Sequence, residues 1–164
     1  LDWLGSNIDK FELSEKYALL VPGGSARRGN KRWPVHQFKE LAQKLTALGL
    51  RVVLIGQASE SVLHSDVADK RDGVISLAGA TTLAEVAALG RSAMVSIGND
   101  TGPMHILAAG GRPTFVLFGG ASDPVLCAPR GANVRCLISR DRGPIKDLSV
   151  GQVWEAVGSS VGSA

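Results

Sequence analysis

The chain has 164 residues, of which 45% are hydrophobic, 20% charged and 5% aromatic. This length is typical of one domain with its own core, and the composition excludes collagen-like and disordered chains. Its 18 Lys and Arg residues outnumber its 15 Asp and Glu residues, so the formal charge is only +3. Because four of the cations fall within residues 27–32, a local anion site is favoured over a surface for duplex nucleic acid.

Cysteine usage and hydropathy indicate the compartment. No apolar run approaches the ~20 residues of a membrane helix, and residues 1–10 lack the basic and apolar regions of a signal peptide. Cys127 and Cys136 are too few for a disulfide scaffold and match no zinc spacing. We therefore expect a soluble, cytoplasmic chain with free thiols, whose role stays open.

Short apolar runs alternate with segments of helical spacing along most of the chain. Strands are predicted at residues 17–21, 51–55, 74–77, 94–97, 114–118 and 134–138. Helices are predicted to begin near Pro34, Ser59, Thr82, Pro103 and Ser149. Near-continuous apolar strands that alternate with helices predict an α/β fold, a Rossmann-like, doubly wound parallel sheet of about six strands.

Three segments are expected along the chain. Residues 1–16 read as an amphipathic lead-in from something upstream, residues 17–157 as the domain, and residues 158–164 as a frayed tail. The second helix is expected to bury Val62, Leu63 and Val67. In open parallel sheets ligands bind beyond the carboxyl ends of the strands, so we expect the chemistry in the loops after the first, second, fourth and fifth strands.

The first of these loops, residues 22–34, reads PGGSARRGNKRWP. Its glycines allow close backbone approach, and its cations precede a helix N-terminus, so phosphate is the natural ligand. A solvated basic loop is the simpler alternative. Gly24 and Gly29 have the spacing of a nucleoside-triphosphate loop, but Asn30 precedes Lys31 and no Ser or Thr follows it, so that motif fails.

Glu60 follows the second strand. A carboxylate at this place can accept hydrogen bonds from the two hydroxyls of a ribose. Alternatively, it only complements the dipole of the helix that begins there.

The most informative segment is residues 98–105, GNDTGPMH. Gly102 allows a tight turn before a helix, and the N–H groups of Met104 and His105 are expected to be unpaired. With the Thr101 hydroxyl they would form a diphosphate cradle, while Asp100 would face sugar hydroxyls. His105 is either a phosphate donor or a structural histidine.

Several other motifs are absent. The sequence has no dinucleotide fingerprint, zinc-protease motif or nucleophile elbow. No Asp-x-Asp pair is present to hold a metal on a diphosphate, so we expect no metal and no cofactor, with charge compensation from Lys31, the arginines and a helix end. Gly119 and Gly120 after the fifth strand are expected to let a ligand lie against the backbone.

Five stretches resemble the C-terminal half of glycosyltransferase family 9, the ADP-heptose:lipopolysaccharide heptosyltransferases of GT-B architecture. These stretches are LVPGGS (20–25), KRWP (31–34), LAG with TLAE (77–79 and 82–85), GNDTGPMH (98–105) and LFG (117–119). The resemblance covers residues 17–157. It implies a bacterial enzyme that moves heptose from ADP-heptose onto the lipopolysaccharide core, with this half binding the donor.

The resemblance also implies roles for individual residues. Lys31 and Asp100 are implied as catalytic, Lys31 through the departing diphosphate and Asp100 at the sugar. Glu60 is implied at the ribose, and Ser25 where hydroxyl residues contact phosphate; Ala26 beside it cannot supply a hydroxyl. The full set of implied donor-binding residues is Gly24, Ser25, Lys31, Glu60, Asp100, Thr101, Gly102, Met104 and His105.

Family members also have an N-terminal half that carries the acceptor site and the catalytic base, and nothing in this chain corresponds to it. We therefore expect a donor half that is inactive alone and meets the lipopolysaccharide acceptor through that N-terminal domain, at the cytoplasmic face of the inner membrane with peripheral membrane association. Alternatives are a UDP-sugar epimerase-like domain, a stand-alone nucleotide or phosphate-binding module, and a basic RNA-binding domain. Few aromatic residues are available for base stacking, which disfavours a nucleic-acid partner.

Overall fold

The computed structural model describes residues 8–13, 16–24, 31–120, 123, 125 and 130–162. Six parallel strands form one sheet in the order β3-β2-β1-β4-β5-β6. This is the order of the Rossmann fold, so the predicted fold class is confirmed. The strands are β1 (Tyr17–Val21), β2 (Arg51–Leu54), β3 (Val74–Ser76), β4 (Val95–Asn99), β5 (Thr114–Phe118) and β6 (Val134–Ile138).

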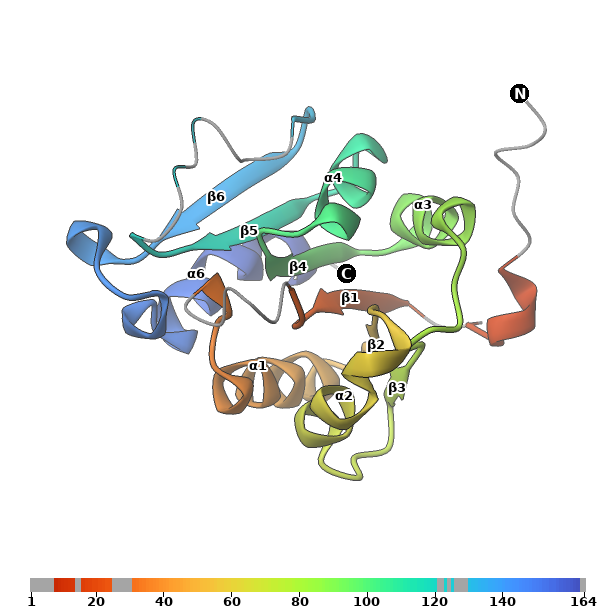
Figure 1. The fold of residues 1–164 in the computed structure, drawn as a ribbon. Coiled ribbons are helices and arrows are strands. Elements are labelled where there is room, and N and C mark those ends of the chain that lie inside the picture. Colours follow the sequence, from red (N-terminus) through yellow and green to blue (C-terminus); the bar gives the residue numbers. More distant parts are fainter. Residues whose placement is uncertain are drawn as a thin grey trace.

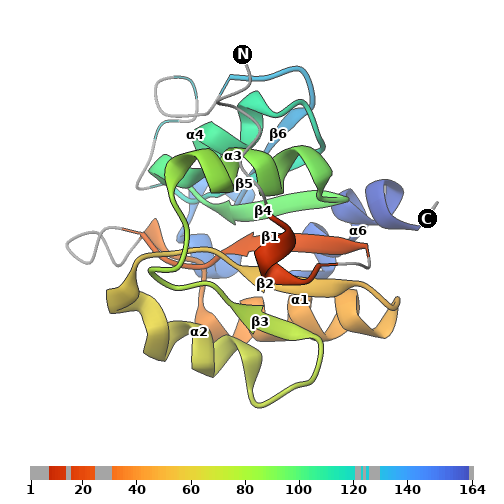
Figure 2. The same cartoon turned by 90° about the vertical axis from the view of Figure 1, so that its right-hand side faces the viewer.

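Helices cover both faces of the sheet, as Figures 1 and 2 show. The α-helices are α1 (Val35–Ala47), α2 (Ser61–Ala68), α3 (Leu83–Ser92), α4 (Gly102–Ala109) and α6 (Val150–Val161). Short 3-10 helices are η2 (Asp9–Phe11), η4 (Ala58–Glu60), η5 (Arg140–Arg142) and η6 (Ile145–Asp147). Helices α1 and α2 lie on one side of the sheet, and α3 and α4 on the other (Figure 2).

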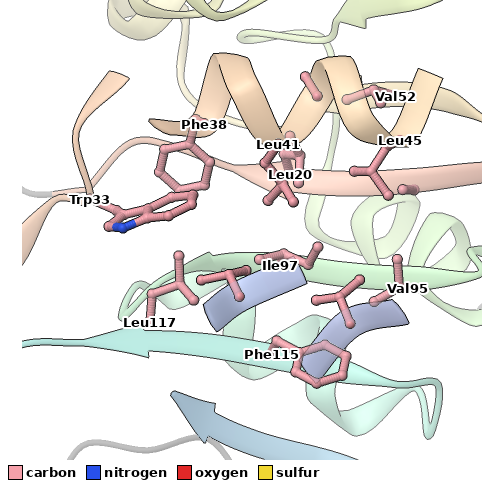
Figure 3. Packing of buried hydrophobic residues seen from close by; sticks show 14 of the residues in the cluster. Leu20, Trp33, Phe38, Leu41, Leu45, Val52, Val95, Ile97, Phe115 and Leu117 are labelled. Atoms are coloured by element: carbon pink, nitrogen blue, oxygen red, sulfur yellow. The ribbon is translucent and has the colours of Figure 1, made fainter. Parts of the chain in front are cut away.

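One core lies between the sheet and helices α1 and α6. Figure 3 shows Leu41 of α1 over Leu20 of β1, and Phe38 of the same helix over Trp33. The Trp33 ring meets the edge of Phe38 with centroids 5.0 Å apart, and its indole N–H donates to the Leu148 carbonyl at 2.7 Å. Trp33 thereby ties the start of α1 to the segment before α6.

The second core lies under α3 and α4. The Tyr17 hydroxyl donates to the Leu89 carbonyl at 2.7 Å and so joins β1 to α3. The described part of the lead-in also packs on this face through Ile8, Phe11 and Leu13. Alternate residues of each strand enter the two cores, which is the geometry that a sheet covered on both faces requires.

Helix boundaries differ from the predictions at two places. A turn of 3-10 helix precedes α2, whose N-cap is Glu60 and not Ser59. In α2 His64 is buried, whereas Val62, which was expected to be buried, is 71% exposed. Helix α6 begins after the predicted cap Ser149, which forms a capping box with Gln152, but it continues to Val161. Val161 is buried in the core, and the predicted tail is therefore helical up to that residue.

Candidate functional site

A cleft of about 1400 Å³ opens at the carboxyl ends of the strands. Strand β1 lies between β2 and β4, so the loops after β1 and β4 leave the sheet at the point where the strand order reverses. The cleft is lined by residues that follow β1, β2, β3 and β4 and by the first turns of α3 and α4. The predicted position for a ligand therefore coincides with a cleft, although the loop after β3 was not expected to contribute.

Six of the predicted site residues line this cleft together. They are Gly24, Lys31, Glu60, Asp100, Thr101 and Gly102. They come from segments that follow three different strands, and the parallel sheet brings these segments to one edge. Ser25, which the resemblance also implies as a phosphate contact, lies outside the described residues.

Met104 and His105 do not line the cleft, which corrects the sequence prediction. Met104 is fully buried in the core under α4, and its N–H donates to the Thr101 carbonyl at 3.1 Å. Its sulfur lies 2.8 Å from the place of a β-carbon on Gly98, so α4 packs closely on β4. His105 is exposed and is not among the residues that line the cleft.

The loop after β5 was expected to hold ligand, but its glycines serve packing. A β-carbon on Gly119 would lie 2.5 Å from the Ile145 backbone nitrogen, and one on Gly120 would lie 2.0 Å from the Arg142 carbonyl oxygen. Neither glycine lines the cleft. Their missing side chains let the segment before α6 approach β5.

The Glu60 carboxylate lies across the backbone of two glycines. Its Oε2 atom is 1.6 Å from where a β-carbon on Gly23 would be, and 2.7 Å from that place on Gly56. Burial raises the pKa of Glu60, against the lowering effects of the Gln57 backbone and the Arg32 guanidinium. Oε2 is buried and has no hydrogen-bond partner among the described residues.

Two further polar groups of the cleft are buried without partners in the described part of the chain. Thr101 is the N-cap of α4, yet its side chain makes no capping hydrogen bond, and its Oγ1 is unpartnered. Arg32 donates to the Gly24 carbonyl, while its Nε is unpartnered. Buried polar groups are normally hydrogen-bonded, so these atoms mark the cleft as a site for a polar ligand.

Asn99 is a functional residue that the sequence analysis missed. This fully buried side chain donates to the Pro22 and Gly23 carbonyls at 3.0 and 3.1 Å and accepts from the Trp33 N–H at 2.9 Å. It thereby holds together the chain on both sides of the basic loop. The available signal was a polar residue at the end of an apolar strand beside the switch point.

One wall of the cleft is apolar. It is formed by Ile55, Leu63, Leu83 and Val86, with Ala58, Gly79 and Thr81 beside them. Leu83 is 72% exposed although it is apolar, so it offers surface to a planar ligand. This wall was not predicted, because Gly79 and Thr81 follow β3.

Three other findings concern the described residues alone. No group of three or more His, Cys, Asp or Glu side chains there is arranged to hold a metal ion. Within the same ranges, no helix has the length and apolar character to cross a bilayer. Cys136 is a free cysteine whose pKa is raised by burial and by the charge of Asp100; Cys127 lies outside the described residues.

A Rossmann-like sheet with a polar cleft at its switch point places the chain among the doubly wound α/β domains, which bind ligands at that point. Comparison with known families makes the assignment specific. The model of glycosyltransferase family 9 (heptosyltransferase) matches residues 5–157, and the chain belongs to this family.

Characterised relatives and solved structures agree with this assignment. Lipopolysaccharide heptosyltransferase 2 of Salmonella typhimurium is 33% identical over 119 residues, which cover 68% of this chain and 34% of that protein. The structure of E. coli ADP-heptose lps heptosyltransferase II matches with a TM-score of 0.85 and 26% identity, over 98% of this chain and 51% of that one. E. coli heptosyltransferase WaaC with ADP matches with a TM-score of 0.80 and 25% identity, over 90% and 45%. The chain thus spans about half of these structures.

Proposed function

We propose that the cleft binds the donor of a heptosyltransferase, with ADP-heptose as the ligand, and that the chain is the donor-binding half of that enzyme. The observation that carries the proposal is that the Glu60 carboxylate and the buried, unpartnered atoms of Thr101 and Arg32 lie in one cleft at the switch point. Family membership supports it. So does the similarity to a heptosyltransferase solved with ADP.

Each part of the donor has a matching part of the cleft. Lys31, the Thr101 hydroxyl and the first turn of α4 hold the diphosphate, since cations and a helix N-terminus favour an anion. Glu60 accepts from the ribose hydroxyls, and Asp100 accepts from the hydroxyls of the heptose. The apolar wall with Leu83 takes the base.

In the transfer step, an acceptor hydroxyl forms a bond to the anomeric carbon as the bond to the diphosphate oxygen breaks, with inversion. Lys31, Arg32 and the N-terminal end of α4 stabilise the charge that develops on the departing diphosphate, without a resident metal. The hydroxyl proton passes to a base in the acceptor half. The whole enzyme then works in the cytoplasm, at the inner membrane that carries its lipopolysaccharide acceptor.

Calorimetric titration of ADP, UDP and GDP into the chain tests this function. We expect ADP to bind most tightly of the three. Lys31→Ala should lower the affinity for ADP about tenfold or more, because a hydrogen bond to a charged group contributes about 1.5–3 kcal/mol. Asp100→Ala should weaken ADP-heptose while leaving ADP unchanged. Lys39→Ala is the matched control, since this lysine pairs with Asp69 at 3.1 Å, away from the cleft.

A preference for UDP in that titration contradicts the proposal and favours an epimerase-like domain. Equal effects of Lys31→Ala and Lys39→Ala contradict the role of Lys31 at the diphosphate.

A further inference from the structure

Behind Glu60 lies a polar side chain that the proposed function leaves without a role. His64 is fully buried in α2, one helical turn after Glu60. Its Nδ1 lies 2.7 Å from the Ser76 hydroxyl at the end of β3. Its Nε2 is buried and has no hydrogen-bond partner among residues that the structure describes. Burying a polar nitrogen without a hydrogen bond lowers the stability of the fold, so the position of His64 suggests a function.

The unpartnered atoms of His64 and Glu60 face the same point. His64 Nε2 lies 2.8 Å, and Glu60 Oε2 2.7 Å, from the place that a β-carbon on Gly56 would occupy. Since Gly56 has no β-carbon, no side chain of this residue stands between the two atoms, and a polar gap of this kind can be bridged by one water molecule. The glycine thus leaves open the space between a nitrogen and a carboxylate oxygen.

The position of the imidazole proton decides whether Nε2 of His64 can donate. The Ser76 hydroxyl oxygen accepts from the Ala78 N–H at 3.3 Å and keeps its own proton, which it can donate to Nδ1 of His64. In the tautomer that accepts this proton at Nδ1, the imidazole proton is on Nε2, on the side of Glu60. Burial lowers the pKa of His64, against the raising effect of the Ile55 carbonyl, so the ring is neutral at pH 7.

We propose that His64 is a positioning residue, which donates from Nε2 to Oε2 of Glu60 and leaves Oε1 of that carboxylate to accept from the ribose hydroxyls. This role rests on the proposed function, because the ribose is that of the nucleotide. The other groups that face the carboxylate are the Arg32 guanidinium and the Gln57 backbone. The charged Lys31 and Asp100 line the same cleft.

The first test needs no ligand. The Glu60 carboxyl is titrated by carbon NMR in the unsubstituted chain, in His64→Leu and in His64→Gln, with Glu60→Gln to assign the signal. Loss of the donor destabilises the ionised carboxylate, so His64→Leu should raise the titration midpoint by about one pH unit. His64→Gln retains an N–H donor, so its Glu60 titration midpoint should stay near that of the unsubstituted chain. This variant also separates the loss of the donor from a fault in folding.

The second test compares ADP with pyrophosphate, which lacks ribose. His64→Leu should lower the affinity for ADP about fivefold and leave the affinity for pyrophosphate unchanged. When Glu60→Gln is already present, adding His64→Leu should lower the ADP affinity no further. As pH falls through the Glu60 midpoint, the carboxylate gains a proton and stops accepting from ribose. ADP affinity should therefore decrease at acid pH, starting at a higher pH in His64→Leu.

An unchanged Glu60 midpoint in His64→Leu overturns the inference. Equal weakening of ADP and pyrophosphate overturns it too, because a merely structural role would act on both. If the chain binds no nucleotide but the midpoint still responds to His64, the proposed function fails while the coupling between His64 and Glu60 stands.

Discussion

Glu60 is placed by two residues that have no side chain. Its carboxylate occupies the space where β-carbons of Gly23 and Gly56 would otherwise lie. The sequence showed the acid after the second strand and its possible role at a ribose. It did not show the two glycines beneath it, because they are 33 residues apart along the chain and meet only when β1 and β2 pair.

Gly23→Ala tests this placement. The new methyl group displaces the end of a flexible side chain, so we expect the free energy of unfolding to change by less than about 1 kcal/mol. ADP binding should weaken about tenfold, since the carboxylate is moved from the ribose. Urea unfolding and calorimetry measure the two quantities.

The matched control is Gly158→Ala in α6, where an added β-carbon meets nothing within 4 Å. ADP affinity should be unchanged in this variant. If Gly23→Ala also binds ADP like the unsubstituted chain, the carboxylate does not need this position.

At the scale of elements, the junction of β1 and β4 carries the site. Asn99 ends β4 and bonds the chain on both sides of the basic loop. The segment 98–105 was selected correctly from the sequence, and its predicted site residues Asp100, Thr101 and Gly102 line the cleft. Met104 and His105, which were also predicted, do not line it. A helix shows its period in the sequence, but the rotation of a short helix such as α4 is set by what it packs on.

Asn99→Ala should destabilise the domain strongly. It leaves the Trp33 N–H and the Pro22 and Gly23 carbonyls without their partner, and we expect a loss of about 2–4 kcal/mol in the free energy of unfolding. Urea unfolding measures this loss. Asn133→Ala is the control, since Asn133 is exposed and its side-chain amide donates to the Gly111 carbonyl; a change within about 0.5 kcal/mol is expected there. Equal losses in the two variants would contradict the role of the Asn99 hydrogen bonds in the stability of the domain.

At the scale of the whole molecule, the chain spans about half of the solved heptosyltransferases that it matches. The cleft residues come from the loops and helix ends of a single sheet, so under our proposal the donor binds without a second domain. Sugar transfer does need one under our proposal, because the acceptor and its base lie in the other half.

We therefore expect the 164-residue chain to bind ADP-heptose without transferring heptose. Mass spectrometry of a lipopolysaccharide acceptor after incubation with donor measures transfer. E. coli lipopolysaccharide heptosyltransferase 2, a relative 33% identical to this chain, serves as the positive control. Transfer by the chain alone at a comparable rate would refute the assignment as a donor half.

The alternation of apolar strands and helices determined the α/β class and all six strands, because a strand buried on both faces is apolar throughout. The helix caps Thr82 and Ser149 were also predicted from the sequence, since capping depends on residues within three positions of each other. Glu60, Lys31 and Thr101 of the cleft were also found from the sequence, because each lies in a segment that follows a predicted strand. These features depend on residues that are close together in the chain, so the sequence by itself predicts them.

Only the tertiary structure decided which of these residues share one cleft and which side chains turn away from it. Helix α2 packs with His64 inward, the packing of α4 on Gly98 buries Met104, and Gly119 and Gly120 meet the segment before α6. Each outcome depends on contact between segments distant in the chain. Such contacts have no period and no fixed spacing in the sequence, so they emerge only when the sheet is assembled.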